Sequence, residues 1–278
     1  MNKTYIIAEI GINHNGDMNL AKELIDMAYS SGCDAVKFQK RTLSEVYTDE
    51  ELDVYRESPW GTTNRQQKEG LEFSIEEYKE LEIYTKGRVL DFIVSCWDIP
   101  SIDLVEEHLN VDYHKVASAL MTDKSFLRKL VETGKPIIAS TGMNNSSGVN
   151  LAMHTLGFDN VKYLLACTST YPTKPEDMNL KYIQTLKQEY PKCKIGFSNH
   201  YSGALASHGA IALGAECIEF HITKDRTMYG SDQAASIEHV DVLVKGIRLL
   251  EKMVGDGVKV IYEDEKPIAS KLRKYNTI

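Results

Sequence analysis

The stretch KIGFSNHYSGALASHGAIALGAECIEFH (194–221) decides the fold of this chain. It begins and ends with short apolar runs, KIGFS (194–198) and ECIEFH (216–221), which are typical of parallel strands covered on both faces. The segment between them has helical periodicity and stops at Gly214, a residue suited to ending a helix. We therefore predict two neighbouring parallel strands joined by a helix.

The same pattern recurs along the chain. Further strands are predicted at YIIAEI (5–10), AVKFQ (35–39), DFIVSC (91–96), YHKVAS (113–118), PIIAST (136–141) and VKYLLAC (161–167). Helical periodicity occurs at 20–32, 75–87, 125–134, 182–190 and 203–214. Eight strand–helix units in 278 residues favour the α/β class and a single (β/α)8 TIM barrel. A doubly wound open sheet is the alternative, but no Gly-x-Gly-x-x-Gly follows the first strand.

Two segments depart from the regular pattern. Residues 42–74 form a long polar excursion after the second strand, and we expect a βα loop that acts as a lid or interface element, or is loosely ordered. Residues 258–278 form a charged tail that we expect to wrap the outside of the barrel. We otherwise treat 1–278 as one barrel domain. Glycines that follow helical segments are expected to act as C-caps, namely Gly32, Gly87, Gly134 and Gly214.

Composition excludes several classes of protein. The net charge of −8, with both signs interspersed, argues against a nucleic-acid surface. No apolar run reaches the roughly 18 residues of a membrane span, and the N-terminal apolar stretch is too short for a signal peptide. We expect a cytoplasmic protein without membrane contact. No C-x-x-C pair occurs, and we expect free thiols rather than disulfides at Cys33, Cys96, Cys167, Cys193 and Cys217.

Function in such a barrel sits at the carboxyl ends of the strands. Nearly every predicted strand delivers a polar residue there, which an ordinary structural strand does not need. These residues are Glu9, Lys37, Gln39, Ser95, Lys115, Ser118, Ser140, Thr141, Thr168, Ser169, Tyr171, Ser198, His200 and His221. A full ring of this kind predicts one convergent site.

Two pairs within the ring suggest specific chemistry. His200 and His221 end neighbouring strands, which suits a divalent metal such as Mn²⁺, Zn²⁺ or Fe²⁺, although a histidine at a strand end can also be a structural hydrogen-bonding residue. Lys37 and Lys115 point toward the barrel mouth, where a buried ammonium group needs an anionic partner. They indicate a phosphate and carboxylate cradle, with an ion pair to Glu9 or Asp232 as the alternative.

A series of motifs keeps its order and spacing over essentially the whole chain: AEIGINHNG (8–16), VKFQ (36–39), PIIASTGM (136–143), LLACTSTYPT (164–173), IGFSNH (195–200), IEFHIT (218–223), Asp232 and GDGVKVIYEDEKP (255–267). In these motifs the chain resembles the N-acetylneuraminate (sialic acid) synthase family. The resemblance implies a synthase that joins phosphoenolpyruvate to a sugar aldehyde and forms a nine-carbon 2-keto sugar acid.

The resemblance also implies roles for individual residues. His200 and His221 match the metal ligands. The positions that match the phosphoenolpyruvate site are Ser95, Lys115, Ser118, Ser140, Tyr171 and Ser198. Those that match the sugar site are Lys37, Gln39 and Asp232. Glu9 falls where the family places a carboxylate beside a metal-bound water, and the implied catalytic residues are Glu9, Lys37 and Lys115.

The chemistry that follows from the resemblance is metal-dependent. C3 of phosphoenolpyruvate attacks the aldehyde, whose oxygen is polarised by a divalent ion; we expect Mn²⁺, with Mg²⁺, Co²⁺, Zn²⁺ or Fe²⁺ as alternatives. Water near Glu9 adds at C2, and phosphate leaves by C–O cleavage. Lys115 holds the phosphate, and Lys37 assists at the new alkoxide.

Several departures from the family concern the sugar acceptor. The chain stops at Ile278, so we expect no antifreeze-like domain, whose arginine in the family reaches the partner subunit's sugar site. Leu120 replaces a carboxylate that contacts the acylated amino sugar. Other replacements are Cys96 for threonine, Ser169 for asparagine and Asn199 for aspartate. The acceptor can thus be N-acetylmannosamine-like or another aldose. Candidates for a substitute lid are the 42–74 loop and the tail residues Lys266, Lys271, Arg273 and Lys274.

Three alternatives stay open at this point. The first is a 3-deoxy-octulosonate 8-phosphate-type synthase that uses a phosphorylated aldose, for which Arg65 and Lys68 could supply the extra cations. The second is a non-catalytic sugar-binding paralogue. A barrel metal hydrolase is the third, disfavoured by the lack of several metal-binding carboxylates. On the resemblance we also expect a homo-oligomer, most simply a dimer.

Overall fold

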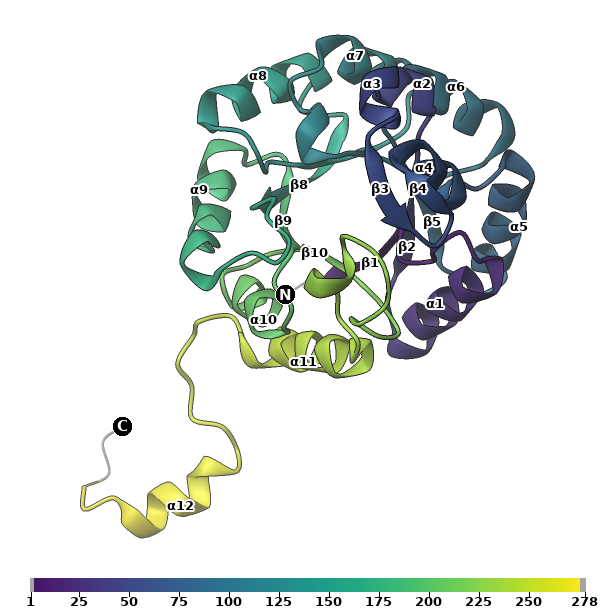
Figure 1. Cartoon of the computed structure of the whole chain (residues 1–278). Coiled ribbons are helices and arrows are strands. Elements are labelled where there is room, and N and C mark those ends of the chain that lie inside the picture. Colours follow the sequence, from purple (N-terminus) through teal and green to yellow (C-terminus); the bar gives the residue numbers. More distant parts are fainter. Residues whose placement is uncertain (1–2, 276–278) are drawn as a thin grey trace.

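Eight parallel strands close into a barrel in the order β1-β10-β9-β8-β7-β6-β5-β2 (Figure 1). The computed structural model describes residues 3–275. The predicted (β/α)8 TIM barrel is confirmed, and every predicted strand is present. The barrel strands are β1 (Tyr5–Gly11), β2 (Ala35–Lys40), β5 (Asp91–Cys96), β6 (Tyr113–Val116), β7 (Ile137–Ser140), β8 (Val161–Cys167), β9 (Lys194–Asn199) and β10 (Cys217–His221).

Helices surround the barrel as an outer ring (Figure 1). In chain order they are α1 (Met18–Ser31), α5 (Ile75–Lys86), α6 (Ile99–His108), α7 (Lys124–Glu132), α8 (Ser146–Leu156), α9 (Tyr182–Glu189), α10 (Leu205–Ala212) and α11 (Val240–Met253). Short 3₁₀ helices lie in the loops, at Ser118–Leu120, Pro175–Asp177 and Gln233–Ala235. Side-chain caps start several of the outer helices; Asp17, for example, accepts hydrogen bonds from the backbone of α1.

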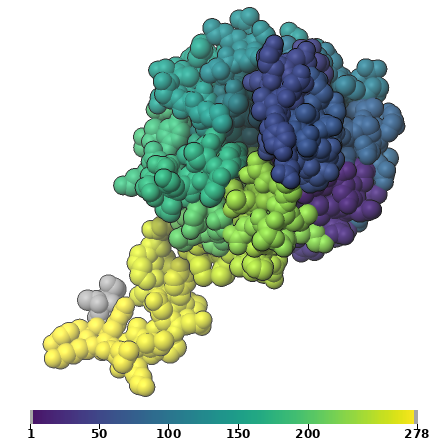
Figure 2. Space-filling view, in the orientation of Figure 1, coloured from purple at the N-terminus to yellow at the C-terminus, as the bar shows by residue number. Residues whose placement is uncertain are grey.

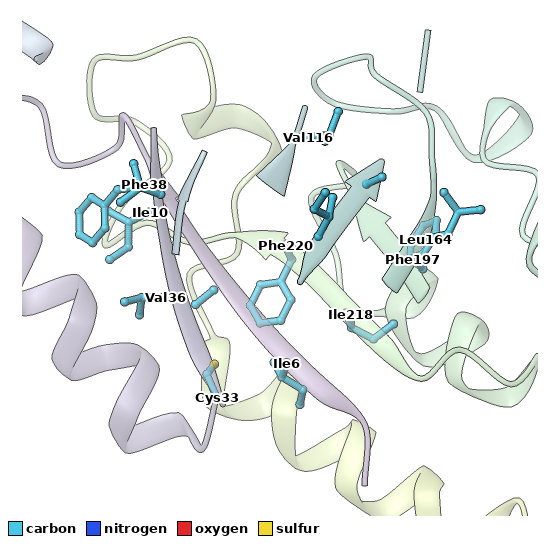
Figure 3. Close-up of a cluster of buried hydrophobic side chains, with 14 of the residues drawn as sticks. Ile6, Ile10, Cys33, Val36, Phe38, Val116, Leu164, Phe197, Ile218 and Phe220 are labelled. Carbon is cyan, nitrogen blue, oxygen red and sulfur yellow. The ribbon is translucent and has the colours of Figure 1, made fainter. Parts of the chain in front are cut away.

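The two faces of each barrel strand pack against different surroundings, because successive side chains point to opposite faces. One face packs against the helices and forms the large core, of which Figure 3 shows Ile6, Val36 and Ile218. The other face points into the barrel, where an apolar plug is formed by Ile7, Ala35, Ile93, Ile138, Tyr163, Leu165 and Cys217. Two residues further along these strands, the same inward face carries Glu9, Lys37, Ser95, Ser140, Cys167 and Glu219. Strand alternation therefore places polar side chains directly above this apolar plug.

Strand register brings the polar residues of neighbouring strands side by side. Glu9 of β1 is paired with His221 of β10 on one side and with Lys37 of β2 on the other. Ser198 of β9 is paired with Glu219 of β10. The register thus groups carboxylates, lysine and histidine at one part of the barrel rim before any side-chain contact is considered.

The expected glycines are found at the ends of their helices, but they differ in backbone conformation. Gly32, Gly134 and Gly214 have φ of 85°, 71° and 91°, the left-handed conformation that glycine adopts without steric cost. Gly87 follows α5 with φ of −60°, and the left-handed residue of this turn is Val89, with φ of 57°. The chain therefore turns two residues later than the glycine suggests, on a β-branched residue that is 93% exposed.

Replacing Val89 by glycine is expected to raise the free energy of unfolding by about 1 kcal/mol. A left-handed conformation costs a residue with a Cβ about 1–2 kcal/mol, and the greater freedom of glycine in the unfolded chain offsets part of that gain. Urea unfolding followed by circular dichroism measures the change. Ile83→Gly, an exposed position inside α5, is the matched control and should lower stability. A decrease for Val89→Gly as well would contradict the proposed strain.

Residues 42–74 are folded and lie over the barrel mouth (Figures 1 and 2). They contain α2 (Leu43–Val46), α3 (Asp49–Leu52), a hairpin of β3 (Tyr55–Ser58) and β4 (Gly61–Thr63), and α4 (Asn64–Leu71). Gly16, with φ of 68°, lies so close to this segment that a Cβ there would be 2.0 Å from the carbonyl oxygen of Gly70. Trp60 of the hairpin packs against Tyr229 at 5.7 Å between ring centroids. Contacts with two other loops thus hold the segment over the mouth.

The C-terminal tail does not wrap the barrel, and that expectation is wrong. Beyond α11 the chain extends away from the barrel and includes α12 (Glu265–Leu272) (Figures 1 and 2). Its side chains are exposed almost throughout, so the tail lacks the packing that would hold it against the helices. The tail also lies away from the mouth, so of the two candidates for a lid it is the 42–74 segment that covers the barrel (Figures 1 and 2). Within residues 3–275, none of the helices has the length and apolar character that crossing a membrane requires.

Candidate active site

A pocket opens at the carboxyl ends of the barrel strands. Of the side chains predicted as catalytic, substrate-binding or metal-binding, all except Asp232 line it: Glu9, Lys37, Gln39, Ser95, Lys115, Ser118, Ser140, Tyr171, Ser198, His200 and His221. The same wall includes Glu219, Cys167, Ser169 and Trp97, to which the sequence analysis gave no site role beyond placing Ser169 in the ring. Apart from Thr141 and Thr168, which do not line this pocket, the ring of polar strand ends converges on one cavity.

Four buried charges of alternating sign form the floor of this pocket. Lys37 Nζ lies 2.6 Å from Glu9 Oε2 and 4.0 Å from Glu219 Oε1. Lys115 Nζ lies 3.8 Å from the same Glu219 oxygen. Lys37 thus forms an ion pair with Glu9, as the alternative interpretation of the lysines allowed, while Lys115 keeps a looser contact with its carboxylate.

Burial and charge act against each other in this cluster. Burial alone lowers the pKa of Lys37, but the carboxylates of Glu219 and Glu9 outweigh it and raise the pKa overall. For Lys115 burial outweighs the attraction of Glu219, and its pKa is lowered. Burial raises the pKa of Glu219, yet the two ammonium groups outweigh it and bring the pKa below its usual value. Lys115 is therefore the cation whose charge is least compensated, and an anion beside it would favour its charged form.

Glu219 is the principal residue that the sequence analysis missed. It lies inside the apolar run ECIEFH (216–221), two positions before His221, so strand alternation places both side chains on the inward face. A carboxylate inside a buried strand is rare unless it is paired, and this signal could have identified it. The second Oε atom of Glu219 is buried and has no hydrogen-bond partner among the described residues.

Hydroxyl groups surround Lys115. Its Nζ donates to Ser140 Oγ at 2.8 Å, and Ser198 Oγ donates to Glu219 Oε1 at 3.3 Å. Ser95 Oγ reaches the Lys115 carbonyl at 3.4 Å. Since hydroxyl groups can turn toward a ligand, this group forms a small polar cradle around one ammonium group. Its size and polarity suit a phosphate or carboxylate group.

The two histidines come from adjacent strands and face each other. Their ring centroids are 5.5 Å apart, and the Tyr171 ring stacks on His200 at 4.1 Å. His200 Nδ1 lies 2.8 Å from the Thr168 carbonyl oxygen, which can only accept, so Nδ1 carries the proton and Nε2 keeps a free lone pair. His221 Nδ1 is buried, has no hydrogen-bond partner within residues 3–275 and lies 3.5 Å from Asp232 Oδ2. Burial is the largest influence on His221 and lowers its pKa, which favours the neutral imidazole.

The donor set fits a metal ion only in part. Over residues 3–275, no group of three or more His, Cys, Asp or Glu side chains is arranged to hold one. Burial lowers the pKa of His200, but the contact with Cys167 outweighs it and raises the pKa overall. In their neutral forms the two imidazoles could supply two ligands and leave the remaining positions to water and substrate.

Asp232 lies in a second cavity beside the first. This cavity has a volume of about 230 Å³. It shares part of its wall with the main pocket, through Gln39, Trp97, Met143 and Tyr171. Gln39 donates to Glu9 Oε1 at 2.7 Å and therefore links the two spaces. Of the three residues predicted to face the sugar, Gln39 lines both cavities, Lys37 lines the main pocket and Asp232 lines the second cavity.

The residues that depart from the family occupy different environments. Ser169 lines the main pocket, whereas Cys96 is buried outside it. Asn199 accepts from the Tyr201 backbone and donates to the carbonyls of Tyr201 and Gly203, so it shapes the loop after β9. Leu120 packs against the hydrophobic core. The five cysteines are free thiols, as expected.

Comparison with known proteins gives a consistent result. The sequence model of the NeuB family matches residues 24–259. The chain is 36% identical to N-acetylneuraminate-9-phosphate synthase of Homo sapiens, over 97% of this chain and 76% of that protein. It is 37% identical to N,N'-diacetyllegionaminic acid synthase of Campylobacter jejuni, over 99% and 84%. Its structure resembles that of N-acetylneuraminic acid synthetase from Leptospira borgpetersenii, with a TM-score of 0.84, 30% identity and coverage of 99% and 94%.

Proposed function

This chain belongs to the NeuB family, and from that premise we propose that it joins phosphoenolpyruvate to a sugar aldehyde, forming a 2-keto-3-deoxy sugar acid and releasing phosphate. One observation carries the proposal: a buried lysine, Lys115, in a cradle of hydroxyl groups, next to a carboxylate–lysine pair, Glu9 and Lys37. The cradle suits a small anion, and the pair can exchange protons with a carbonyl compound and water.

Lys115 and the neighbouring serines would hold the phosphate of phosphoenolpyruvate. In the described part of the chain the carboxylate nearest to this ammonium group is that of Glu219, 3.8 Å away, and a phosphate would complete its pairing. The serine hydroxyls can donate to the same oxygens. This contact persists until C–O cleavage, and it stabilises the negative charge on the leaving phosphate.

Glu9 and Lys37 would handle the protons. A bond forms between C3 of phosphoenolpyruvate and the aldehyde carbon, and the aldehyde oxygen takes a proton from the Lys37 ammonium group. Water then adds to the electron-poor C2, and its proton goes to the Glu9 carboxylate. Gln39 and Lys37 each bind one oxygen of that carboxylate, so the group is already oriented for the incoming water. The bond between C2 and the phosphate oxygen then breaks, the proton of the C2 hydroxyl group passes to the leaving phosphate, and the keto acid remains. The proton held by Glu9 returns to Lys37 across their ion pair.

We also propose that His200 and His221 hold a divalent metal ion, Mn²⁺ in the first place and Mg²⁺, Co²⁺, Zn²⁺ or Fe²⁺ as alternatives. When bound, such an ion polarises the aldehyde oxygen as a Lewis acid. The orientation of His200 by the Thr168 carbonyl and the unpaired Nδ1 of His221 support the assignment.

His200→Ala and His221→Ala are each expected to weaken Mn²⁺ binding by about tenfold or more, because each removes one of two protein ligands. Titration of the protein with Mn²⁺, followed by the electron paramagnetic resonance signal of the free ion, measures the dissociation constant without any turnover. His154→Ala, an exposed position on α8, is the control and should bind Mn²⁺ as the parent does. If all three variants bound Mn²⁺ with the same dissociation constant, His200 and His221 would not be its ligands.

An activity screen tests the proposed reaction directly. The purified protein is incubated with phosphoenolpyruvate, Mn²⁺ and a panel of free and phosphorylated aldoses. We expect one phosphate to be released for each phosphoenolpyruvate consumed. The mass of the product should equal the mass of the aldose plus that of pyruvic acid. Saturable sugar binding without phosphate release from any aldehyde would instead favour the non-catalytic paralogue. A homodimer stays a prediction of the resemblance.

A further inference from the structure

A further cavity lies at the opposite end of the barrel from the active site, beside the amino ends of β7, β8 and β9. Its volume is about 410 Å³, and we call it the amino-end cavity. The residues that line it come from three stretches of the chain, 134–136 before β7, 158–162 at the start of β8 and 192–194 at the start of β9. These strands are neighbours in the barrel, so the three stretches lie side by side.

Lysines make up most of the charged lining of the amino-end cavity. Four lysines line it against a single carboxylate, that of Asp159; the lysines are Lys135, Lys162, Lys192 and Lys194. This excess of positive charge is local, because the chain as a whole has a net charge of −8. Ammonium groups that share one cavity repel each other and attract anions, so the cavity favours a negatively charged ligand.

The ion pairs of these lysines compensate only part of the charge. Lys135 binds Glu106 at 2.8 Å, although Glu106 does not line the cavity. Lys192 reaches Asp159 only at 4.0 Å, which is longer than a hydrogen bond. Even when Glu106 is counted with the lining, four lysines face two carboxylates.

Two of the four lysines have no ion pair. For residues 3–275, no carboxylate lies within 4.0 Å of the ammonium group of Lys162 or of Lys194. Lys162 is exposed at the start of β8. Lys194 is half-buried at the start of β9, and its Nζ lies 5.7 Å from the centroid of the Tyr163 ring. Both ammonium groups are therefore available to a ligand in the cavity.

We propose that the amino-end cavity binds a small ligand with a chain of two or three phosphate groups, such as a nucleoside triphosphate. Neighbouring parallel strands lie about 4.8 Å apart, so lysines at the starts of three strands are spread over about 10 Å. A chain of phosphates can contact several of them at once, which a single phosphate cannot. The volume of the cavity falls in the range of small-molecule sites, and Pro136 and Phe158 give it an apolar side against which a base can pack.

Calorimetric titration with ATP and with inorganic tripolyphosphate, without added divalent ions, tests this inference. We expect both to bind, and orthophosphate to bind at least about tenfold more weakly. The double variant Lys162→Met with Lys194→Met should weaken the binding of both probes by about tenfold or more, whereas arginine at both positions should keep most of the affinity. Lys245→Met with Lys252→Met removes two exposed lysines of α11 outside the cavity and should bind as the parent does.

The two probes also distinguish the source of the phosphate chain. Tighter binding of ATP than of tripolyphosphate would show that the base contributes and that the ligand is a nucleotide. Equal binding of the two would show that the phosphate chain alone is recognised.

The main pocket also contains buried cations, so the titrations are repeated with Lys115→Met. Unchanged affinity in that variant supports a separate site. Loss of binding in Lys115→Met would place the probes in the main pocket and overturn the inference. Failure of both probes to bind at millimolar concentration, or equal affinity of the parent and the Lys162/Lys194 double variant, would overturn it as well. These measurements need no turnover, so the inference is tested separately from the proposed reaction.

Discussion

Lys115→Met is expected to lower kcat/KM for phosphoenolpyruvate by about 10²- to 10³-fold, the effect typical of removing a buried group that binds the transition-state charge. Methionine keeps much of the length and volume of the side chain but cannot pair with a phosphate. Since Lys115 is buried and hydrogen-bonded to Ser140, no solvent-exposed cation can take its place. Initial rates of phosphate release at varied phosphoenolpyruvate concentration measure the loss, and calorimetric titration measures binding.

The control for Lys115→Met must account for folding, because the substitution also removes a counter-charge from buried Glu219. The double variant Lys115→Met with Glu219→Gln leaves no such uncompensated charge and should unfold closer to the parent, while its activity stays low. Lys129→Met, which removes a partly exposed lysine on α7 outside the pocket, should leave the rate unchanged. Substantial activity in a folded Lys115→Met protein would show that the phosphate binds elsewhere.

Glu9→Gln is expected to lower kcat by about 10²- to 10⁴-fold, the usual contribution of a general base. The amide has the shape of the carboxylate but cannot take the proton of the attacking water. Phosphoenolpyruvate and Mn²⁺ should still bind with similar affinity, because Lys115 and the histidines are unchanged. Two measurements check this prediction. Phosphate release should be lost, whereas calorimetric titration should show that phosphoenolpyruvate still binds.

Glu57→Gln is the matched control for Glu9→Gln, since Glu57 is an exposed carboxylate on the β3–β4 hairpin and its substitution should not change kcat. Lys37 loses an ion pair at 2.6 Å when Glu9 is changed, so the unfolding transition of the variant should also be recorded. A Glu9→Gln protein with the rate of the parent would rule out Glu9 as the base.

Local patterns were enough to predict where the strands lie and which of their residues point inward. Apolar runs such as KIGFS (194–198) are found as strands. A parallel strand of a barrel is covered on one face by the barrel interior and on the other by helices, so both faces favour apolar residues. His200 and His221 meet because their strands are adjacent, and strand adjacency follows from chain order in a barrel. The family could be inferred from the sequence for the same reason, because its motifs lie at the ends of strands and follow one another in a fixed order along the chain.

Residues that act through distant partners were harder to predict. Glu219 was missed because a carboxylate in an apolar strand has meaning only with Lys37 and Lys115 beside it. Asp232 was assigned to the sugar site, and the structure places it in the adjoining cavity. Gly87 was expected to cap α5 and does so, but the left-handed residue of the turn that follows is Val89, which the sequence did not indicate.

The sequence by itself determined the barrel, its eight strands and the set of inward polar residues, because two-residue and helical periodicities are local properties of the chain. The tertiary structure alone decided which charges pair. It joined Glu9 to Lys37, left Lys115 with a looser partner and paired Arg65 with two aspartates, whereas Lys68 of the same helix has no ion-pair partner within 4.0 Å among residues 3–275. The physical reason is that an electrostatic interaction depends on distance and burial, and both are set by segments far apart in the chain, such as the 42–74 segment folded over the mouth.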